Sequence, residues 1–316
     1  MRYLITGSSG QIGTNLALRL LDEGHEVLGV DLRPNPWTDR VCTRQLDLSR
    51  LQPCEPGTLC GQALPTPDAV VHLAAHAKVH ALVREPALAL ENTVMTHNVL
   101  EYCRHARIPL VFSSSREVYG DIHRFDTEEH SADFAFTEST YSASKVAGEA
   151  MVYAYARCYA LPYLVFRFSN VYGRYDCDLE RMERVVPLFI SRVRRGEPLT
   201  VFGEGKVLDF THVDDCVDGI ARGLERLVDG RLRDQTINLA YGQGHSLVEL
   251  ARLIGEALGC SPQVVTTPSR LGEVTRYVAN LDRARSLLGF CPQVALPEGV
   301  RQAVAWSAAW HSGGRP

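Results

Sequence analysis

The chain has 316 residues, 45% of them hydrophobic, and a formal net charge of -4 at pH 7. This length can bury a large core, as one domain or as two closely apposed lobes, and it is long enough for an enzyme. The small negative charge excludes a basic surface for nucleic acid, and no segment approaches the roughly twenty consecutive apolar residues of a membrane span. We therefore expect neither a nucleic-acid partner nor a membrane partner.

The start of the chain and its cysteines favour a cytoplasmic location. An apolar strand begins at once, with no secretion leader ahead of it. The 9 cysteines are scattered without a Cys-x-x-Cys pair or a His/Cys cluster of zinc-ligand spacing, so free thiols are the simplest interpretation. His72 lies in an apolar strand and is interpreted as a core residue rather than a ligand. We expect no metal site.

The first motif is a glycine-rich turn between a strand and a helix. Residues 3–5 are typical of a buried parallel strand, and leucines at 16, 20 and 21 recur at helical spacing. Glycine permits the positive φ of a tight turn, a bare backbone beneath phosphates, and close packing of helix on strand. The helix N-terminus adds free N–H groups. The turn therefore predicts a pyrophosphate site formed by Gly7, Gly10, Gln11, Ile12 and Gly13.

An acidic residue ends the second predicted strand. Residues 24–31 form a turn and a strand that closes at Asp31, where a carboxylate can accept hydrogen bonds from the adenosine ribose. A 2′-phosphate would be repelled there, so Asp31 favours NAD. Arg33, two residues later, leaves NADP open.

The following segments alternate strands and helices. We expect a third strand at 44–48, where Asp47 can meet the adenine amino group, an irregular proline-rich crossover at 51–67, and a fourth strand at 69–75 that ends in small residues. A helix at 87–107, a strand at 110–112, a helix at 142–159 and a strand at 163–168 follow. This βαβ alternation predicts an α/β fold with a Rossmann-type, doubly wound parallel sheet.

Beyond residue 168 the alternation becomes irregular. Residues 174–184 are charged and loop-like, and a helix at 185–194 and a strand at 199–202 come next. Segments 210–213 and 236–240 are interpreted as returns to the main sheet. The predicted division is an NAD-binding domain of residues 1–167 plus about 209–243, and a smaller, discontinuous C-terminal substrate-binding lobe of about 168–208 and 244–316.

A candidate catalytic group follows the fifth strand. Ser115 stands near its end, and Tyr141 and Lys145 are four residues apart, which on a helix puts them on one face. A phenol is a poor base at pH 7, but a neighbouring ammonium and an oxidised nicotinamide both favour the phenolate. Tyr141 can then take a proton from an alcohol as its hydride leaves, while a serine hydroxyl holds the substrate oxygen.

Together these segments resemble the extended short-chain dehydrogenase/reductase family, and within it the NAD-dependent nucleotide-sugar epimerases, dehydratases and decarboxylases. The resemblance spans nearly the whole chain. The motifs that carry it are Thr6-Gly7-x-x-Gly10-x-x-Gly13, Val70 to Ala75, Asn92 to Glu101, Ser113 to Gly120, Tyr141-x-x-x-Lys145, Arg167-Phe168-x-Asn170-Val171-Tyr172-Gly173 and Asp209-Phe210-x-x-Val213-Asp214-Asp215.

The resemblance implies NAD as cofactor, a nucleotide-diphosphate sugar as substrate, and a homodimer formed through the two long helices near 87–107 and 142–159. It implies Ser115, Tyr141 and Lys145 as a catalytic triad, with Lys145 also on the nicotinamide ribose. The further implied cofactor contacts are Asp47, Leu48, Leu73, Ala74, Ala75 and Asn92. The implied substrate contacts are Lys78, Ser115, Arg116, Asn170, Arg184, Lys206 and Arg276, of which Asn170 and Arg276 would meet the diphosphate.

The family's shared chemistry begins with hydride removal at sugar C4, which gives a transient 4-keto intermediate. We expect a 4-epimerase that acts on a UDP-hexose or a UDP-hexuronate. UDP-glucuronate decarboxylation is the alternative, because Glu117 and Arg184 resemble that enzyme's glutamate and carboxylate-binding arginine. Dehydration of an NDP-sugar comes third, because Arg116 stands where dehydratases carry an aspartic acid.

Several positions keep other interpretations open. Leu208 replaces the arginine that the family places before Asp-Phe, so one phosphate contact is lost unless Lys206 replaces it. Glu117 can equally be a structural acceptor, and Arg184 a solvated charge. A non-catalytic dinucleotide sensor on the same fold is the alternative from another class, against which the intact triad argues.

Overall fold

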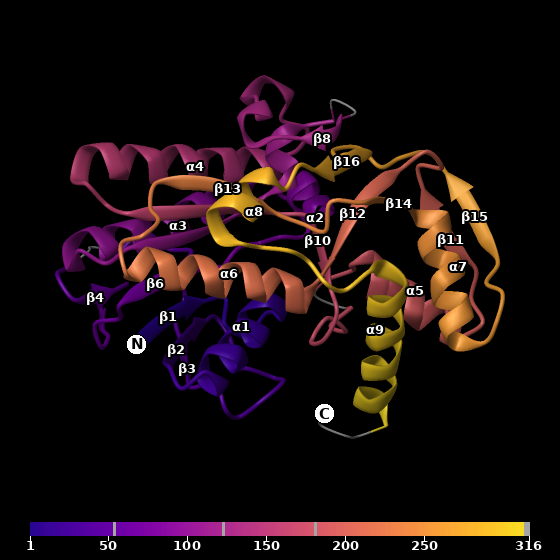
Figure 1. The fold of residues 1–316 in the computed structure, drawn as a ribbon, viewed down its shortest axis with the longest axis horizontal. Helices are drawn as coiled ribbons and strands as arrows, with labels where there is room; N and C mark the ends of the chain where they lie inside the picture. The colour runs from indigo at the N-terminus through magenta and orange to yellow at the C-terminus, as the bar shows by residue number, and fades with distance from the viewer. Residues whose placement is uncertain (53–54, 122–123, 180–181, 313–316) are drawn as a thin grey trace.

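A seven-stranded parallel sheet forms the centre of the computed structural model, which describes residues 1–52, 55–121, 124–179 and 182–312 (Figure 1). Its inner strands are mostly apolar, and all six residues of the inner strand β7 are buried. From one edge to the other they are β3 (Thr43–Gln45), β2 (Glu26–Asp31), β1 (Arg2–Thr6), β6 (Ala69–His72), β7 (Leu110–Ser115), β9 (Tyr163–Phe168) and β13 (Gln235–Leu239). The predicted doubly wound α/β fold is confirmed.

Helices cover both faces of this sheet because successive strand residues point to opposite sides. Ile5 packs into one core cluster with α1 (Gln11–Asp22) and α6 (Val213–Val228). Leu4 packs into another with α3 (Ala87–Ala106) and α4 (Thr140–Tyr159). His72, which the sequence assigns to the core, is 1% exposed, and its ring bonds the hydroxyls of Thr6 and Thr96. Burial lowers its pKa to about 3.

A second lobe lies beside the sheet and has its own apolar core (Figure 1). Its helices are α5 (Val185–Arg194), α7 (Leu247–Leu258) and α9 (Leu296–His311). Its larger sheet contains β10 (Asn170–Tyr172), β12 (Val207–His212), β16 (Arg276–Ala279), β8 (Arg124–Thr127) and β14 (Gly244–Ser246). Its smaller sheet pairs β11 (Leu199–Phe202) with β15 (Val264–Thr267).

The interpretation of 210–213 as a return to the main sheet is wrong. Residues 210–212 belong to β12, which pairs with β10, β14 and β16, because Leu208 and Phe210 pack into the core of the second lobe, and Val213 begins α6. Segment 236–240 does return, as β13 beside β9. Helix α8 (Asp282–Leu288), grouped by sequence with the second lobe, packs Ala284 and Leu288 into the core of the first. The domain boundaries themselves stay a prediction.

Two short structures between β3 and α3 went unpredicted. Helix α2 (Val79–Arg84) precedes α3, and β4 (Thr58–Leu59) and β5 (Gln62–Ala63) form a small hairpin within the proline-rich crossover. Within the described ranges no helix is long and apolar enough to cross a membrane.

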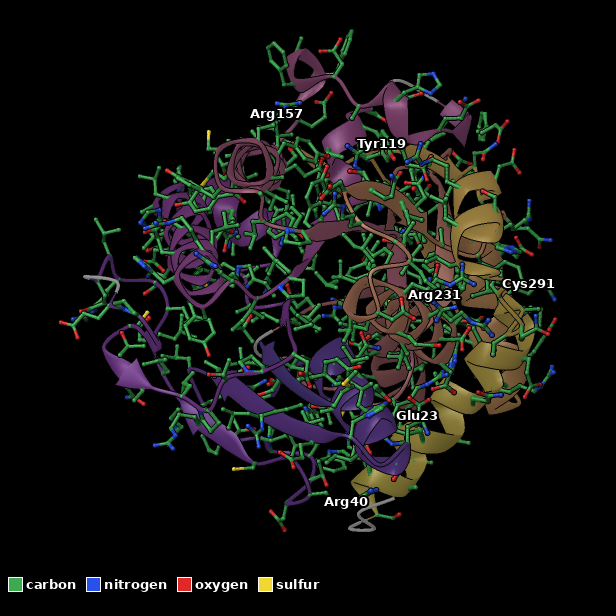
Figure 2. The ribbon with its side chains drawn as sticks, turned by 60° about the vertical axis from the view of Figure 1, so that its left-hand side comes forward. Glu23, Arg40, Tyr119, Arg157, Arg231 and Cys291 are labelled. Atoms are coloured by element: carbon green, nitrogen blue, oxygen red, sulfur yellow. The ribbon has the colours of Figure 1, made fainter. Side chains whose placement is uncertain are left out.

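The surface of the molecule carries the long charged side chains, such as Arg40 and Arg231, which Figure 2 labels. Cys291, labelled there too, is exposed, and no disulfide joins the cysteines of the described residues. Cys54 lies outside those residues. No group of three or more His, Cys, Asp or Glu side chains in the described chain could hold a metal ion.

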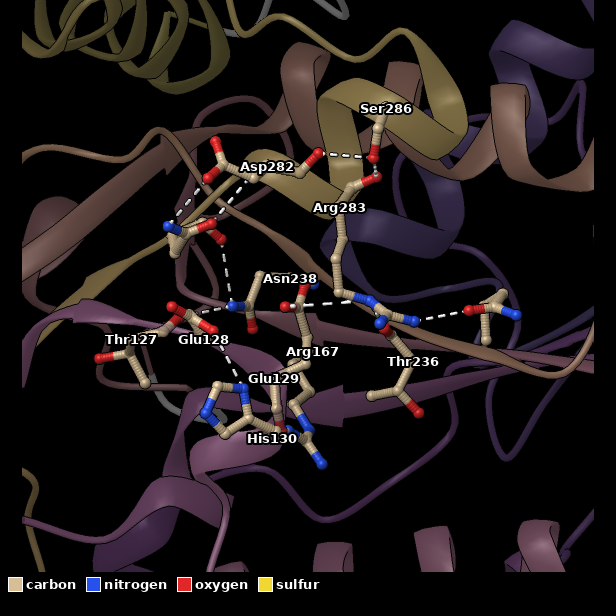
Figure 3. A network of polar contacts seen from close by, with 12 residues as sticks. Thr127, Glu128, Glu129, His130, Arg167, Thr236, Asn238, Asp282, Arg283 and Ser286 are labelled. Carbon is tan, nitrogen blue, oxygen red and sulfur yellow. Dashed lines mark hydrogen bonds and ion pairs between the residues drawn. The ribbon is translucent and has the colours of Figure 1, made fainter.

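A buried network around Arg167 connects the main sheet to the loops beside it (Figure 3). The guanidinium of Arg167, on β9, makes two charged hydrogen bonds of 2.8 and 2.6 Å to Glu149 on α4. It also donates to the Glu129 carbonyl at 2.6 Å. The Glu129 carboxylate accepts the backbone N–H of Asn238, and the Asn238 amide donates to the Thr127 carbonyl. The network therefore fixes the segment after β8 against β9 and β13.

Removing one partner of this pair leaves an uncompensated buried charge. Arg167 and Glu149 side chains are 5% and 6% exposed, so Arg167→Met should lower the free energy of unfolding by about 3–5 kcal/mol. The matched control is Arg301→Met, whose ion pair with Glu298 is 62% and 48% exposed and should matter by less than about 1 kcal/mol. Urea unfolding of both variants measures the difference, and equal losses would contradict the assignment.

Candidate active site

A cavity of about 550 Å³ lies between the two lobes, at the carboxyl ends of the main strands. The glycine-rich turn, Asp31 and the ends of β6 and β7 line one part of it. Side chains of α5, β11 and β12 line the other part. The cavity is therefore continuous from the predicted dinucleotide site to the predicted substrate site.

The glycine-rich turn fits a pyrophosphate. Gly7 has a φ of +73°, and a Cβ there would lie 2.7 Å from the backbone nitrogen of Ala74. A Cβ on Gly13 would lie 2.2 Å from the Gly7 carbonyl oxygen, so both positions require glycine. Helix α1 begins at Gln11 with no side-chain cap, which leaves its first N–H groups for a ligand. Gly7, Gly10, Gln11, Ile12 and Gly13 all line the cavity.

The adenosine side of the cavity is also present. Asp31 is 5% exposed and lines the cavity at the end of β2. Arg33 forms an ion pair with Asp178 at 3.0 Å. Hydrogen bonds from Ser49 hold the pKa of Asp47 below its ordinary value. The predicted contacts Asp47, Leu48, Leu73, Ala74 and Ala75 line the cavity as well.

Asn92 lies behind this wall and not in the cavity lining. Its amide accepts the His76 N–H at 2.7 Å and donates to the His76 carbonyl at 3.0 Å. It also donates to the Ser144 hydroxyl. Asn92 therefore fixes the segment after β6 by hydrogen bonds, and it does not itself line the cavity in which a cofactor would bind.

Ser115, Tyr141 and Lys145 meet where the two parts of the cavity join. Ser115 ends β7, and both Ser115 and Tyr141 line the cavity there, where the Ser115 hydroxyl acts to lower the pKa of the Tyr141 phenol. Tyr141 and Lys145 stand on α4, which starts at a capping box between Ser139 and Ser142. The Lys145 ammonium donates to the Ser113 carbonyl at 2.8 Å and lies 5.9 Å from the centre of the Tyr141 ring.

Ion pairs organise the substrate side of the cavity. Four predicted substrate cations each meet a carboxylate: Arg116 with Glu117 at 2.9 Å, Arg184 with Asp176 at 2.7 Å, Lys78 with Glu183 at 3.1 Å, and Lys206 with Glu273 at 2.6 Å. Arg184 also donates to the Gln11 side chain of the glycine-rich turn. The second carboxylate oxygen of Glu117 is buried without a hydrogen-bond partner in the described residues, and burial raises the pKa of this group.

Of the two residues predicted to bind the diphosphate, one lines the cavity and the other does not. Asn170 lines the cavity, where its amide donates to the Asp209 carbonyl at 3.0 Å and its oxygen accepts from Arg116 at 3.4 Å. Arg276 does not line it: this residue is exposed, with its guanidinium 5.7 Å from the Phe125 ring centre. The placement of Arg276 at the substrate site is therefore not supported.

A family model described as the NAD dependent epimerase/dehydratase family matches residues 3–240. The chain belongs to this family. A probable UDP-glucuronate 4-epimerase of Rhizobium meliloti is 31% identical, over 97% of this chain and 96% of its own length. UDP-glucuronic acid decarboxylase 1 of Xenopus tropicalis is 30% identical, over 96% of this chain and 71% of its own. The crystal structure of Thermus thermophilus UDP-glucose 4-epimerase in complex with NAD aligns with a TM-score of 0.80 at 30% identity, over 97% and 98% of the two chains.

Membership in the NAD dependent epimerase/dehydratase family confirms the resemblance that the motifs indicate. It also confirms NAD as the cofactor and an enzyme as the class of protein. The residues of this chain fit that cofactor, since the tight glycine turn and the uncapped start of α1 line the cavity and Asp31 lines it at the end of β2. NAD, when bound, supplies the acceptor and donor of a hydride.

Burial shifts the protonation of both groups in the chain alone. It raises the pKa of Tyr141 to about 12, although Ser115, Arg184 and Arg116 act to lower it. Burial likewise lowers the pKa of Lys145 to about 8, and the Glu149 carboxylate opposes this. The phenolate, which the ammonium and an oxidised nicotinamide together favour, stays a prediction for the enzyme with its cofactor bound.

Several cavity residues were missed by sequence reasoning. Arg270 lines the cavity with its guanidinium 3.8 Å from the Phe202 ring centre. It lies in the loop before β16, which begins at Arg276, and the turn at Gly272, with a φ of +80°, separates the two arginines. An arginine in a loop with a turning glycine was the signal available for Arg270. Asp176 gave none, because its burial depends on contacts between distant segments.

The lowered pKa of Lys145 makes stability depend on pH. Its folded value is about 8 and its ordinary value 10.5, so the unfolded chain binds more protons between them, and stability rises with pH across that window. Between about pH 7.5 and about pH 9.5 the free energy of unfolding should rise by about 1–2 kcal/mol more in the native protein than in Lys145→Met. Urea unfolding at both pH values tests this, and parallel pH profiles would contradict it.

Proposed function

We propose that this chain is a nucleotide-sugar 4-epimerase that oxidises C4 of a UDP-hexose transiently and reduces it again. The observation that carries the proposal is that Ser115, Tyr141 and Lys145 line one cavity together with the glycine-rich turn and the side chains of the second lobe. A sugar hydroxyl placed there meets a proton acceptor while its carbon faces the nicotinamide side. The return step needs only rotation of the ketone before hydride comes back.

Proton transfer falls to Tyr141 in this proposal. Tyr141 is 8% exposed and Ser115 is 9% exposed, so bulk water does not compete for the transferred proton. With its pKa raised to about 12, Tyr141 holds its proton at neutral pH and is ready to donate to a C4 oxygen. Taking a proton requires added positive charge, which the oxidised cofactor supplies when bound.

The charge pattern supports a neutral hexose over a hexuronate. Arg184, the candidate clamp for a carboxylate, is already held by Asp176 and Gln11, and Arg116 is held by Glu117. A uronate carboxylate would have to displace one of these partners. UDP-hexuronate epimerisation and UDP-glucuronate decarboxylation stay as second candidates, because relatives at 31% and 30% identity carry those names.

For the diphosphate we propose Arg270 together with Asn170 and Lys206. Arg270 lines the cavity with no carboxylate partner among the described residues, so its charge is open to an anion. Lys206 is two residues before Leu208, and both side chains line the cavity. The Lys206 ammonium can therefore take the place of the arginine that is absent at position 208, if it gives up its ion pair with Glu273.

A homodimer through α3 and α4 belongs to the same proposal. The two helices pack side by side, and each exposes a large apolar side chain: Leu90 is 70% exposed and Tyr159 is 54% exposed. A second copy that covers this face would bury both. The cytoplasmic location stays a prediction.

Mass spectrometry on UDP-glucose, UDP-N-acetylglucosamine and UDP-glucuronate, each incubated without added reductant, tests the reaction. We expect a product of unchanged mass and shifted retention from a neutral hexose. Tyr141→Phe should lower turnover by about 10²–10⁴-fold with bound NAD unchanged, because only the proton-transfer group is lost. Loss of CO2 from the glucuronate would favour the decarboxylase. Bound NAD without turnover of any substrate would favour the dinucleotide sensor.

Arg270 and Arg276 provide a matched pair for the diphosphate site. Arg270→Ala should weaken UDP binding by about tenfold or more, since a charged hydrogen bond to phosphate is lost. Arg276→Ala, at the start of β16 and outside the cavity, should leave UDP binding unchanged. Isothermal titration with UDP measures both. A larger loss in Arg276→Ala than in Arg270→Ala would overturn this assignment.

A further inference from the structure

The cofactor end of the cavity contains one residue that favours NAD and one that favours NADP. An acidic residue at the end of the second strand favours NAD, and an arginine nearby accommodates the 2′-phosphate of NADP. This chain has both, Asp31 and Arg33, two positions apart. The contacts of Arg33 decide which preference is expressed.

Arg33 is held away from a ligand by a residue of the second lobe. Its guanidinium pairs with the Asp178 carboxylate at 3.0 Å and donates to the Ser9 carbonyl at 3.4 Å. Asp178 is 145 positions away along the chain, in the charged segment after β10. Arg33, Asp178 and Asp31 all line the same cavity.

Asp31 is fixed independently of that ion pair. One of its carboxylate oxygens accepts the Ser9 N–H at 3.0 Å, and the other accepts the Arg33 N–H at 3.2 Å. These are backbone contacts, so they do not depend on where the Arg33 side chain points. The two carboxylates therefore act separately: Asp31 faces the ribose, and Asp178 neutralises the arginine.

We propose that Asp178 is a specificity-determining residue that excludes NADP by holding the Arg33 guanidinium. A 2′-phosphate entering this end would meet two carboxylates and an arginine whose charge is already compensated. The Nε atom of Arg33 is buried without a hydrogen-bond partner in the described residues, so the guanidinium keeps donor capacity. Removing the Asp178 charge frees this arginine to bind phosphate through two parallel hydrogen bonds. This inference rests on the cofactor and not on the proposed substrate.

The experiment compares native protein, Asp178→Asn, and the double variant Asp178→Asn with Arg33→Ala. After incubation with equal NAD and NADP, the nucleotides retained by the protein are extracted and quantified. Titrations with 2′,5′-ADP and 5′-ADP isolate the contribution of the 2′-phosphate. We expect Asp178→Asn to raise the NADP-to-NAD ratio and the relative affinity for 2′,5′-ADP by about tenfold or more, the value of one charged contact.

The double variant decides whether Arg33 carries the gain. If the inference holds, Arg33→Ala cancels the increase that Asp178→Asn produces. Asp218→Asn is the matched control, since Asp218 pairs with Arg19 at 3.0 Å and does not line the cavity. An unchanged ratio in Asp178→Asn, an equal gain in the control, or a gain that persists without Arg33 would each overturn the proposal.

Discussion

The buried ion pair between Arg167 and Glu149 is the contact on which the rest of the structure depends. Arg167 belongs to β9 and Glu149 to α4, so the pair fixes the helix that carries Tyr141 and Lys145 against the main sheet. Glu149 also accepts the Ser114 hydroxyl at 2.5 Å, beside Ser115 at the end of β7. Burying two charges is favourable only when all their remaining hydrogen-bonding groups are satisfied, and Tyr119, Tyr153 and the Glu129 carbonyl supply those bonds. Stability and the alignment of the predicted catalytic groups therefore share one polar network.

A second constraint is charge compensation in the cavity. Most of its lysine and arginine side chains pair with carboxylates, and among the described residues only Lys145 and Arg270 lack such a partner within 4.0 Å. Several of these pairs join different lobes, as Arg33 with Asp178 and Lys78 with Glu183 do. An anionic ligand must therefore exchange one protein partner for another, and its net gain is smaller than the number of cations suggests. Such exchange gives selectivity, because only a ligand whose charges match the pairs in place and number can bind without leaving a carboxylate unpaired.

Short sequence patterns were sufficient to predict the cofactor turn and the spacing of the catalytic candidates. Packing between segments far apart in the sequence decided the topology of the second lobe and the residues that line its part of the cavity. The glycine turn, Asp31 and the four-residue spacing of Tyr141 and Lys145 depend on backbone geometry within a few residues, and the structure places them together. The sheet to which β12 belongs depends on whether Phe210 meets the first or the second core, and alternation of apolar residues does not contain that choice. Likewise, Arg270 packs on Phe202 in the cavity, whereas Arg276 begins β16 and packs on Phe125 outside it, and these contacts join segments distant in the sequence.

The pKa values of Tyr141 and Lys145 also depend on burial, which the local sequence pattern does not contain. The spacing of Tyr141 and Lys145 predicts a lowered phenol pKa, but both groups are buried, and burial raises the pKa of an acid and lowers that of a cationic base. The result is a phenol with a pKa of about 12 beside an ammonium with a pKa of about 8. At neutral pH both keep their protons, so the chain alone poises Tyr141 as a proton donor. Its conversion to an acceptor depends on the positive charge that the oxidised cofactor brings, and this couples proton transfer to the redox state of the cofactor. In the proposed 4-epimerisation, Tyr141 would therefore act as a base while NAD is oxidised and as an acid once the cofactor is reduced.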